Sequence, residues 1–166
     1  MNRPLRRDMD DLKTFMLRAP RLTLAVAESL TCGRVQARIG EISGASDFFL
    51  GGITAYTIEA KACLLGVDRA AAIAVNAVSA RVAEQMALGV RRRFGSDLAL
   101  ATTGYAEPDL ARQVEQPYAW VAVAWGEEVR SARIDCPGTG RTQAQAAVAQ
   151  AALAALLDWL RERRTP

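Results

Sequence analysis

The sequence of 166 residues contains no histidine. This absence excludes Ser-His-Asp and Cys-His catalysis, HExxH metalloproteases and every metal site that needs a histidine ligand. Lysine is also scarce, because only Lys13 and Lys61 occur among the 21 basic residues. The others are arginines, which do not lose their proton in proteins. A general base must therefore be a carboxylate, a tyrosine, a cysteine or a lysine. Of the two lysines, Lys13 falls on an amphipathic N-terminal helix and Lys61 in a more apolar segment, so Lys61 is the better candidate of the pair.

Cysteine pairs and long apolar runs are missing too. Cys32, Cys63 and Cys136 are odd in number and never form a CxxC pair, so we expect reduced thiols, a cytoplasmic location and no zinc site. No segment is long and apolar enough to span a membrane. The basic N-terminus lacks the apolar stretch that a signal peptide needs.

A strong charge of one sign is absent as well, since the formal net charge is only +3. The arginine clusters at 91–93 and 161–164 fall in the last turns of predicted helices, where cations interact favourably with the helix dipole. A nucleic-acid-binding surface needs a basic stripe with side chains that read bases. We therefore expect neither a nucleic acid nor a membrane as a partner, while a small anionic ligand and a homo-oligomer are compatible with the sequence.

The chain is instead typical of one globular domain, with 51% hydrophobic and 23% charged residues. Helices and strands alternate along it. Predicted helices span residues 5–18, 33–42, 58–65, 69–74, 80–94 and 141–163, and predicted strands span residues 22–27, 48–56, 96–104, 118–126 and 129–136. The pattern predicts an α/β fold with three layers, α/β/α, around a mixed, mainly parallel sheet of about five strands. We expect a single domain, 1–166, in which residues 1–20 form an N-terminal tail and helix.

Polar residues follow three of these strands. Glu28-Ser29-Leu30-Thr31 ends the first, Thr102-Thr103-Gly104 ends the third, and Tyr56 ends the second, with Lys61 one helical turn further on. Ligands bind at the carboxyl ends of parallel strands, so we expect these edges to meet in one crevice. A serine attacks an acyl carbon once a base removes its proton, and a desolvated, neutral Lys61 would serve Ser29. Tyr56 could relay a proton or orient the amine.

Each of these residues also has a purely structural interpretation. A serine at the end of a strand commonly caps the next helix, and a lysine on a short helix is usually solvated. Backbone N–H groups in the turn after Ser29 would be able to hold an oxyanion or a phosphate. The residues by themselves therefore predict an α/β domain with a candidate Ser29–Lys61 site.

Several short stretches match, in order and at near-constant spacing, the motifs of one known family. They are AESLTCG (27–33), GASDFFLGGITAYTIEAKACLLGV (44–67), NAVS (76–79), ALATTGYAEP (99–108) and the turn 138–141. On these motifs, which cover roughly residues 10–160, the chain resembles the CinA C-terminal domain family, the nicotinamide-nucleotide amidohydrolases. Larger members of the family carry a molybdopterin-binding-like domain ahead of this one, and we expect this chain to be a stand-alone form.

The resemblance implies an amidohydrolase that converts nicotinamide mononucleotide into nicotinic acid mononucleotide and ammonia, without a metal or cofactor. It implies Ser29 as the nucleophile, Lys61 as the base and Tyr56 as their catalytic neighbour. It also implies substrate-binding positions, with Arg141 as a partner of the phosphate. These are Glu28, Thr31, Gly33, Ser46, Thr103, Gly104 and Arg141.

Some positions depart from the family pattern. Cys32 stands where the family turn has its first glycine, which predicts backbone strain if that position needs a positive φ. Glu107 replaces a glycine in the loop AEPDLAR (106–112), whose family glycine pair is lost, and Gln145 stands where the family has a second arginine. A carboxylate near a phosphate pocket repels the ligand unless it points away. The alternative reading is therefore a domain of this family that binds a ligand without turnover, or one that acts on another amide.

Overall fold

The computed structural model describes the backbone of residues 3–164 and the side chains of residues 9–164. Its helices are α1 (Arg3–Leu17), α2 (Arg34–Gly40), α3 (Ile58–Leu65), α4 (Arg69–Ala74), α5 (Ala80–Phe94) and α6 (Arg141–Arg164). Its strands are β1 (Leu24–Glu28), β2 (Phe49–Thr54), β3 (Leu98–Tyr105), β4 (Tyr118–Trp125) and β5 (Glu128–Asp135). The predicted helices 58–65, 69–74 and 80–94 are confirmed at both ends, and the other predicted elements differ by a few residues at their ends.

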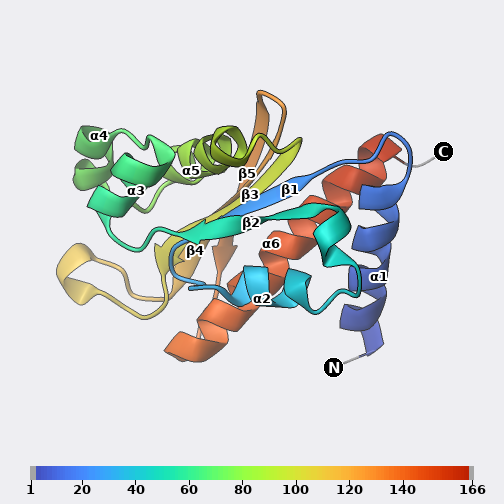
Figure 1. Ribbon diagram of the computed structural model, residues 1–166. Coiled ribbons are helices and arrows are strands. Elements are labelled where there is room, and N and C mark those ends of the chain that lie inside the picture. Colours follow the sequence, from blue (N-terminus) through green and yellow to red (C-terminus); the bar gives the residue numbers. More distant parts are fainter. Residues whose placement is uncertain (1–2, 165–166) are drawn as a thin grey trace.

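The strands form one mixed sheet in the order β2-β1-β3-β4-β5. β1 pairs in parallel with β2 and β3, whereas β3, β4 and β5 pair antiparallel. Helices α3, α4 and α5 cover one face of the sheet, and α1, α2 and α6 cover the other (Figure 1). The predicted three-layer α/β/α architecture with a mixed sheet is confirmed. The parallel part of the sheet consists of the strands β2, β1 and β3.

Side chains of different size alternate along the central strands. Leu24 and Val26 of β1 face the core with α1, α2 and α6, whereas Ala25 and Ala27 face the core with α3, α4 and α5. β1 is buried along its whole length, as expected of a strand covered on both faces. The alanine face allows α5 to approach the sheet closely.

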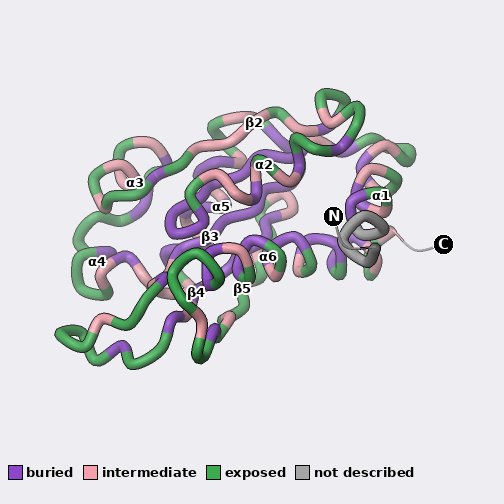
Figure 2. Tube along the Cα trace, turned by 90° about the horizontal axis from the view of Figure 1, so that it is seen from below, coloured by how far each residue is buried: buried purple, intermediate pink, exposed green. Residues whose placement is uncertain are grey.

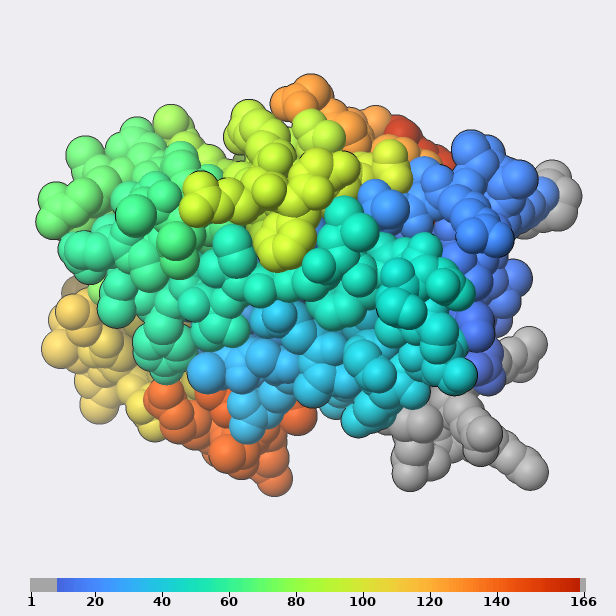
Figure 3. All heavy atoms as spheres, viewed as in Figure 1, coloured from blue at the N-terminus to red at the C-terminus, as the bar shows by residue number. Residues whose placement is uncertain are grey.

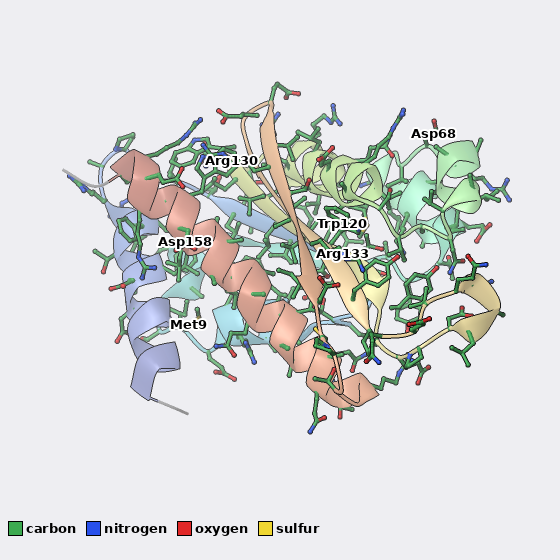
Figure 4. The ribbon with its side chains drawn as sticks, turned by 180° about the vertical axis from the view of Figure 1, so that it is seen from behind. Met9, Asp68, Trp120, Arg130, Arg133 and Asp158 are labelled. Atoms are coloured by element: carbon green, nitrogen blue, oxygen red, sulfur yellow. The ribbon has the colours of Figure 1, made fainter. Side chains whose placement is uncertain are left out.

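Helix α6, near the C-terminal end of the chain, packs against helix α1 near the N-terminal end. Its inner face, which includes Leu156 and Trp159, is buried. α1 lies beside it, with Met9 labelled on α1 in the view from behind (Figure 4). Arg161 donates to the Asp11 carboxylate at 3.0 Å. The core on this side of the sheet is therefore closed by segments from opposite ends of the sequence.

The carboxyl ends of β1, β2 and β3 meet at one edge of the sheet. Glu28 lies in register with Thr54 of β2 and with Thr102 of β3. The chain continues this pairing beyond the strand, because the Ser29 N–H donates to the Thr102 carbonyl at 3.0 Å. The loop 105–117 projects from the same edge and is mostly exposed (Figure 2).

Candidate active site

Helix α3 places Lys61 at the carboxyl edge of the sheet. The helix begins after Thr57, whose side chain accepts the N–H of Ala60 at 3.1 Å, and ends at Gly66, which has φ +68°. α3 packs against Gly89 of α5 so closely that an added Cβ would lie 2.0 Å from the Leu65 carbonyl oxygen. This contact holds the inner face of α3 against the protein, and Lys61 on that face is only 2% exposed.

The Lys61 amine lies against Ser29, as predicted. Its Nζ is 2.9 Å from Ser29 Oγ, 3.0 Å from the Ala55 carbonyl oxygen and 3.1 Å from the Tyr56 carbonyl oxygen. Burial lowers the pKa of Lys61 to about 8, because the charged amine loses hydration. A neutral amine has two N–H bonds and one lone pair, so the two carbonyls can accept the N–H bonds while the lone pair faces the Ser29 hydroxyl.

A cavity of about 570 Å³ opens in front of this pair. That volume is typical of small-molecule sites. Several predicted site residues line it together, namely Ser29, Tyr56, Lys61, Thr103, Gly104 and Arg141. In the space-filling view, α3, the loop 105–117 and the start of α6 lie next to one another at the lower left (Figure 3). The expected convergence of the strand ends on one crevice is confirmed.

Tyr56 connects the reactive pair to the charged side of the cavity. Its carbonyl contacts Lys61 Nζ, and its hydroxyl accepts a hydrogen bond from Arg141 Nη2 at 2.8 Å. Arg141 Nη1 donates to Glu107 Oε1 at 2.6 Å. Glu107 therefore points toward Arg141, and the cavity wall contains an ion pair where the family pattern has a glycine and an arginine.

Glu28 is not a cavity residue, which corrects one expectation. It is fully buried, and its carboxylate accepts the N–H groups of Gly33, Val35 and Gln36 at 2.9, 3.2 and 2.9 Å. These are the N–H groups at the start of α2 that we expected to hold an oxyanion or a phosphate. A carboxylate of the chain itself satisfies them, so Glu28 and Gly33 build the turn that presents Ser29.

Thr31 and Ser46 also lie outside the cavity lining. The Thr31 and Thr102 hydroxyls are 2.7 Å apart in the interior, so Thr31 ties the turn to β3. Ser46 belongs to a 3₁₀ turn, Ala45–Asp47, that precedes β2. It therefore lies at the amino end of a strand whose carboxyl end faces the cavity. The strand β2 separates Ser46 from the site, so the substrate-binding position that the resemblance implied for Ser46 does not line the cavity.

The remaining predicted positions shape the cavity wall. The Thr103 hydroxyl donates to the Ala77 carbonyl at 2.7 Å. Gly104 allows β4 to approach, since an added Cβ would lie 2.5 Å from the Tyr118 carbonyl oxygen. Sequence reasoning missed Asn76 and Ala77 as wall residues, although NAVS was among the matching motifs. Both have a positive φ, 48° and 57°, a conformation rarely adopted by alanine.

The other departures from the family pattern have structural consequences. Cys32 has φ +50°, which confirms the strained turn predicted for that position. Gln145 of α6 is buried, and its Nε2 donates to the Leu30 carbonyl at 2.8 Å. Gln145 thus supports the turn that carries Ser29 and does not line the cavity.

Within residues 3–164 no helix is long and apolar enough to cross a bilayer. Among the described side chains, those of residues 9–164, no three of the histidine, cysteine, aspartate or glutamate type lie close enough together to hold a metal ion.

Comparison with known proteins identifies relatives over nearly the whole chain. The family model of the CinA C-terminal domain matches residues 7–160. A CinA-like protein of Geobacter sulfurreducens is 40% identical over 158 residues, which are 93% of this chain and 37% of the relative. A CinA-like protein of Geobacter sp. strain M21 is 44% identical over 123 residues, 74% of this chain and 30% of the relative. The chain thus spans about a third of the length of these curated relatives.

Solved structures agree with this result. The competence/damage inducible protein CihA of Agrobacterium tumefaciens has a TM-score of 0.80 at 29% identity, over 93% of this chain and 92% of that one. A CinA superfamily protein of Klebsiella pneumoniae 700603 has a TM-score of 0.88 at 24% identity, over 98% and 99%. The similarity to the Klebsiella pneumoniae protein shows that the two proteins share the fold.

Proposed function

The chain belongs to the CinA C-terminal domain family, and from this premise and the Ser29–Lys61 contact we propose that it is an amidohydrolase. The proposed reaction is deamidation of nicotinamide mononucleotide to nicotinic acid mononucleotide and ammonia. The observation on which the proposal rests is a buried amine with a lowered pKa, 2.9 Å from a serine hydroxyl. In a chain without histidine, such a lysine is the group that can accept the serine proton.

The reaction proceeds in two halves. Ser29 Oγ attacks the carboxamide carbon while its proton passes to Lys61 Nζ. The protonated Lys61 then gives a proton to the departing nitrogen, ammonia leaves, and Ser29 holds the pyridine carboxyl group as an ester. In the second half Lys61 takes a proton from water, the hydroxide attacks the ester, and the proton returns to Ser29 Oγ as the acid is released.

The shape of the cavity supports a mononucleotide as the substrate. The Tyr56 carbonyl contacts Lys61, and the Tyr56 hydroxyl contacts Arg141. The length of one tyrosine therefore separates Lys61 from Arg141. The carboxamide and phosphate of a nicotinamide nucleotide are likewise separated by a ring and a sugar. With its amide at Ser29, such a substrate directs its phosphate toward Arg141, and arginine suits phosphate because it can donate two parallel hydrogen bonds.

Ammonia release from nicotinamide mononucleotide tests the proposal. We expect Lys61→Arg to reduce kcat by ~10²-fold or more, because arginine keeps the charge but does not accept a proton. Lys13→Arg is the matched control, since Lys13 only donates to the Ser43 carbonyl at the surface. It should leave kcat unchanged. A thermal melt of each variant separates lost chemistry from lost folding. A folded Lys61→Arg protein that keeps more than about a tenth of the wild-type kcat would contradict the mechanism.

A second candidate function is binding of a ligand without turnover. The observation in its favour is the ion pair between Arg141 and Glu107, which occupies the side chain proposed to bind phosphate. Calorimetry of wild-type protein with nicotinamide mononucleotide distinguishes the two candidates. Heat of binding with no ammonia released over hours indicates a binding domain, whereas ammonia release that Ser29→Ala abolishes indicates the enzyme.

A further inference from the structure

The acidic side chains of the cavity wall are paired with arginines. Glu107 accepts from Arg141 at 2.6 Å, and Asp109 accepts from Arg112 at 2.6 Å. Both carboxylates come from the same loop. The two carboxylates differ in where their arginine partners lie, because Arg141 lines the cavity and Arg112 does not. Glu107 thus neutralises the arginine that faces the ligand space, and Asp109 neutralises one that does not.

We propose that Glu107 is a specificity-determining residue that competes with the phosphate of the substrate for Arg141. The proposal rests on the proposed function and deepens it by naming how the cavity discriminates between the phosphorylated and phosphate-free forms of one carboxamide. A nucleoside with the same carboxamide needs no partner at Arg141, so Glu107 leaves its binding unchanged. A nucleotide must displace the Glu107 carboxylate before its phosphate reaches the guanidinium.

The hydrogen bonds of Arg141 explain why the two anions compete. One terminal nitrogen donates to Glu107 and the other to the Tyr56 hydroxyl. A phosphate binds arginine best when it accepts two parallel hydrogen bonds from the guanidinium. The Glu107 carboxylate occupies one of these donors, and its negative charge repels a second anion brought to the same group.

The exposure of the pair indicates competition and not exclusion. The Arg141 and Glu107 side chains are 46% and 59% exposed, so the carboxylate can rotate into solvent when a phosphate arrives. Exposed ion pairs are weak, and water and salt screen the repulsion. We therefore expect an effect of about tenfold in affinity for the nucleotide, corresponding to ~1.4 kcal/mol.

Binding measurements in a Ser29→Ala background, which prevents turnover, test the proposal. The probes are nicotinamide mononucleotide and its dephosphorylated form, nicotinamide riboside, titrated by calorimetry at low salt. Glu107→Gln removes the charge and keeps the shape of the side chain. We expect it to tighten binding of the mononucleotide about tenfold, and binding of the riboside by less than about twofold. The gain for the mononucleotide should shrink at high salt.

Asp109→Asn is the matched control, because it removes a carboxylate from the same loop that pairs with Arg112. If Glu107 acts through Arg141, this variant should change binding of both probes by less than about twofold. Equal gains from Asp109→Asn and Glu107→Gln would overturn the proposal and indicate a general charge effect. Equal gains for the riboside and the mononucleotide would overturn it as well.

The binding test of Glu107 can fail or succeed independently of the ammonia-release test of the proposed function. Ammonia release by the enzyme with an intact Ser29 reports the amidohydrolase. Absence of ammonia together with the expected pattern of affinities would refute the enzyme and retain the competition at Arg141. Ammonia release together with unchanged affinity of the Glu107→Gln protein would retain the enzyme and refute the competition.

Discussion

The two lysines of the chain illustrate how surroundings determine the chemistry of a residue. Lys13 donates to the Ser43 carbonyl in a hydrogen bond exposed to solvent, whereas Lys61 is buried beside Ser29 and two carbonyls. Burial lowers the pKa of the Lys61 amine to about 8, because desolvation favours the neutral form. A lysine base that is partly neutral near physiological pH follows from the position of Lys61 on α3.

This pKa predicts the pH dependence of the proposed reaction. The base must be neutral, so kcat/KM should rise about tenfold per pH unit below pH 8 and level off above it. The same shift affects folding. Between about pH 8 and 10.5, the ordinary pKa of a lysine, the unfolded chain binds more protons than the folded chain, so the contribution of Lys61 to stability rises with pH. A kcat/KM profile that is flat between pH 6 and 9 would exclude Lys61 as the base.

Cys32 adds strain at the turn that follows Ser29. Its φ of +50° is unfavourable for a residue with a Cβ by about 1 kcal/mol. We expect Cys32→Gly to stabilise the protein by up to about 1 kcal/mol, which raises Tm by about 2–4 °C in a domain of this size. Cys63→Gly is the control, because Cys63 lies inside α3, where glycine costs about 1 kcal/mol. Equal destabilisation by both substitutions in thermal melts would show that Cys32 is not strained.

At the scale of elements, the contact between α3 and α5 determines where the base lies. Gly89 is the point of closest approach, since a Cβ there would overlap the Leu65 carbonyl. Lys61 is one turn away from Leu65 on the same helix. Any displacement of α3 from α5 therefore moves the amine relative to Ser29, which is held on the separate turn after β1.

Gly89→Ala tests this contact. Alanine favours helices over glycine by about 1 kcal/mol, yet we expect a net loss of about 1–3 kcal/mol because the added methyl group overpacks the interface. kcat should fall more than KM changes, because the reactive pair is misaligned while Arg141 stays in place. Gly40→Ala in α2 is the matched control, since its Cβ would meet nothing within 4 Å. Wild-type stability and kcat in Gly89→Ala would show that α3 can shift without consequence.

At the scale of the whole molecule, α1 and α6 close the core on the face of the sheet away from α3. Leu12 of α1 is completely buried in this core, although it does not line the cavity. The two cores share the central strands, which are buried on both faces. We therefore expect the chain to unfold as one cooperative unit.

Leu12→Ala tests this cooperativity. Loss of a fully buried leucine side chain should cost about 2–5 kcal/mol and lower Tm in a single transition, seen equally by circular dichroism and tryptophan fluorescence. kcat of the folded protein should not change. Leu50→Ala, at a leucine that is 43% exposed, should cost less than about 1 kcal/mol. Two separate transitions would indicate that α1 melts independently of the sheet.

Much of the fold could be predicted from the sequence because its signals are local. Asp68 and Ser79 cap α4 and α5 by accepting N–H groups from within the next turn, and Gly66 and Gly95 end α3 and α5 with a positive φ. These interactions join residues a few positions apart. They hold wherever the segment lies in the molecule, so the bounds of these helices follow from the order of residues.

The meeting of Ser29 with Lys61 was also predictable, because both follow strands of one parallel sheet. The carboxyl ends of such strands lie at one edge, and the absence of histidine left lysine as the natural base. The sequence by itself determined that Ser29, Tyr56 and Lys61 reach the cavity edge and which of them has the chemistry of a base.

Only the tertiary structure decided how the polar side chains are paired. It assigned Glu28 to the start of α2, placed Ser46 at the far edge of the sheet, and brought Glu107 to Arg141 across 34 positions of sequence. Such pairings depend on sheet register and on helix packing, which sum many weak contacts between distant segments. A glutamate looks the same in the sequence whether its carboxylate caps a helix or neutralises an arginine of the cavity. Only the groups that folding brings next to the carboxylate determine its role.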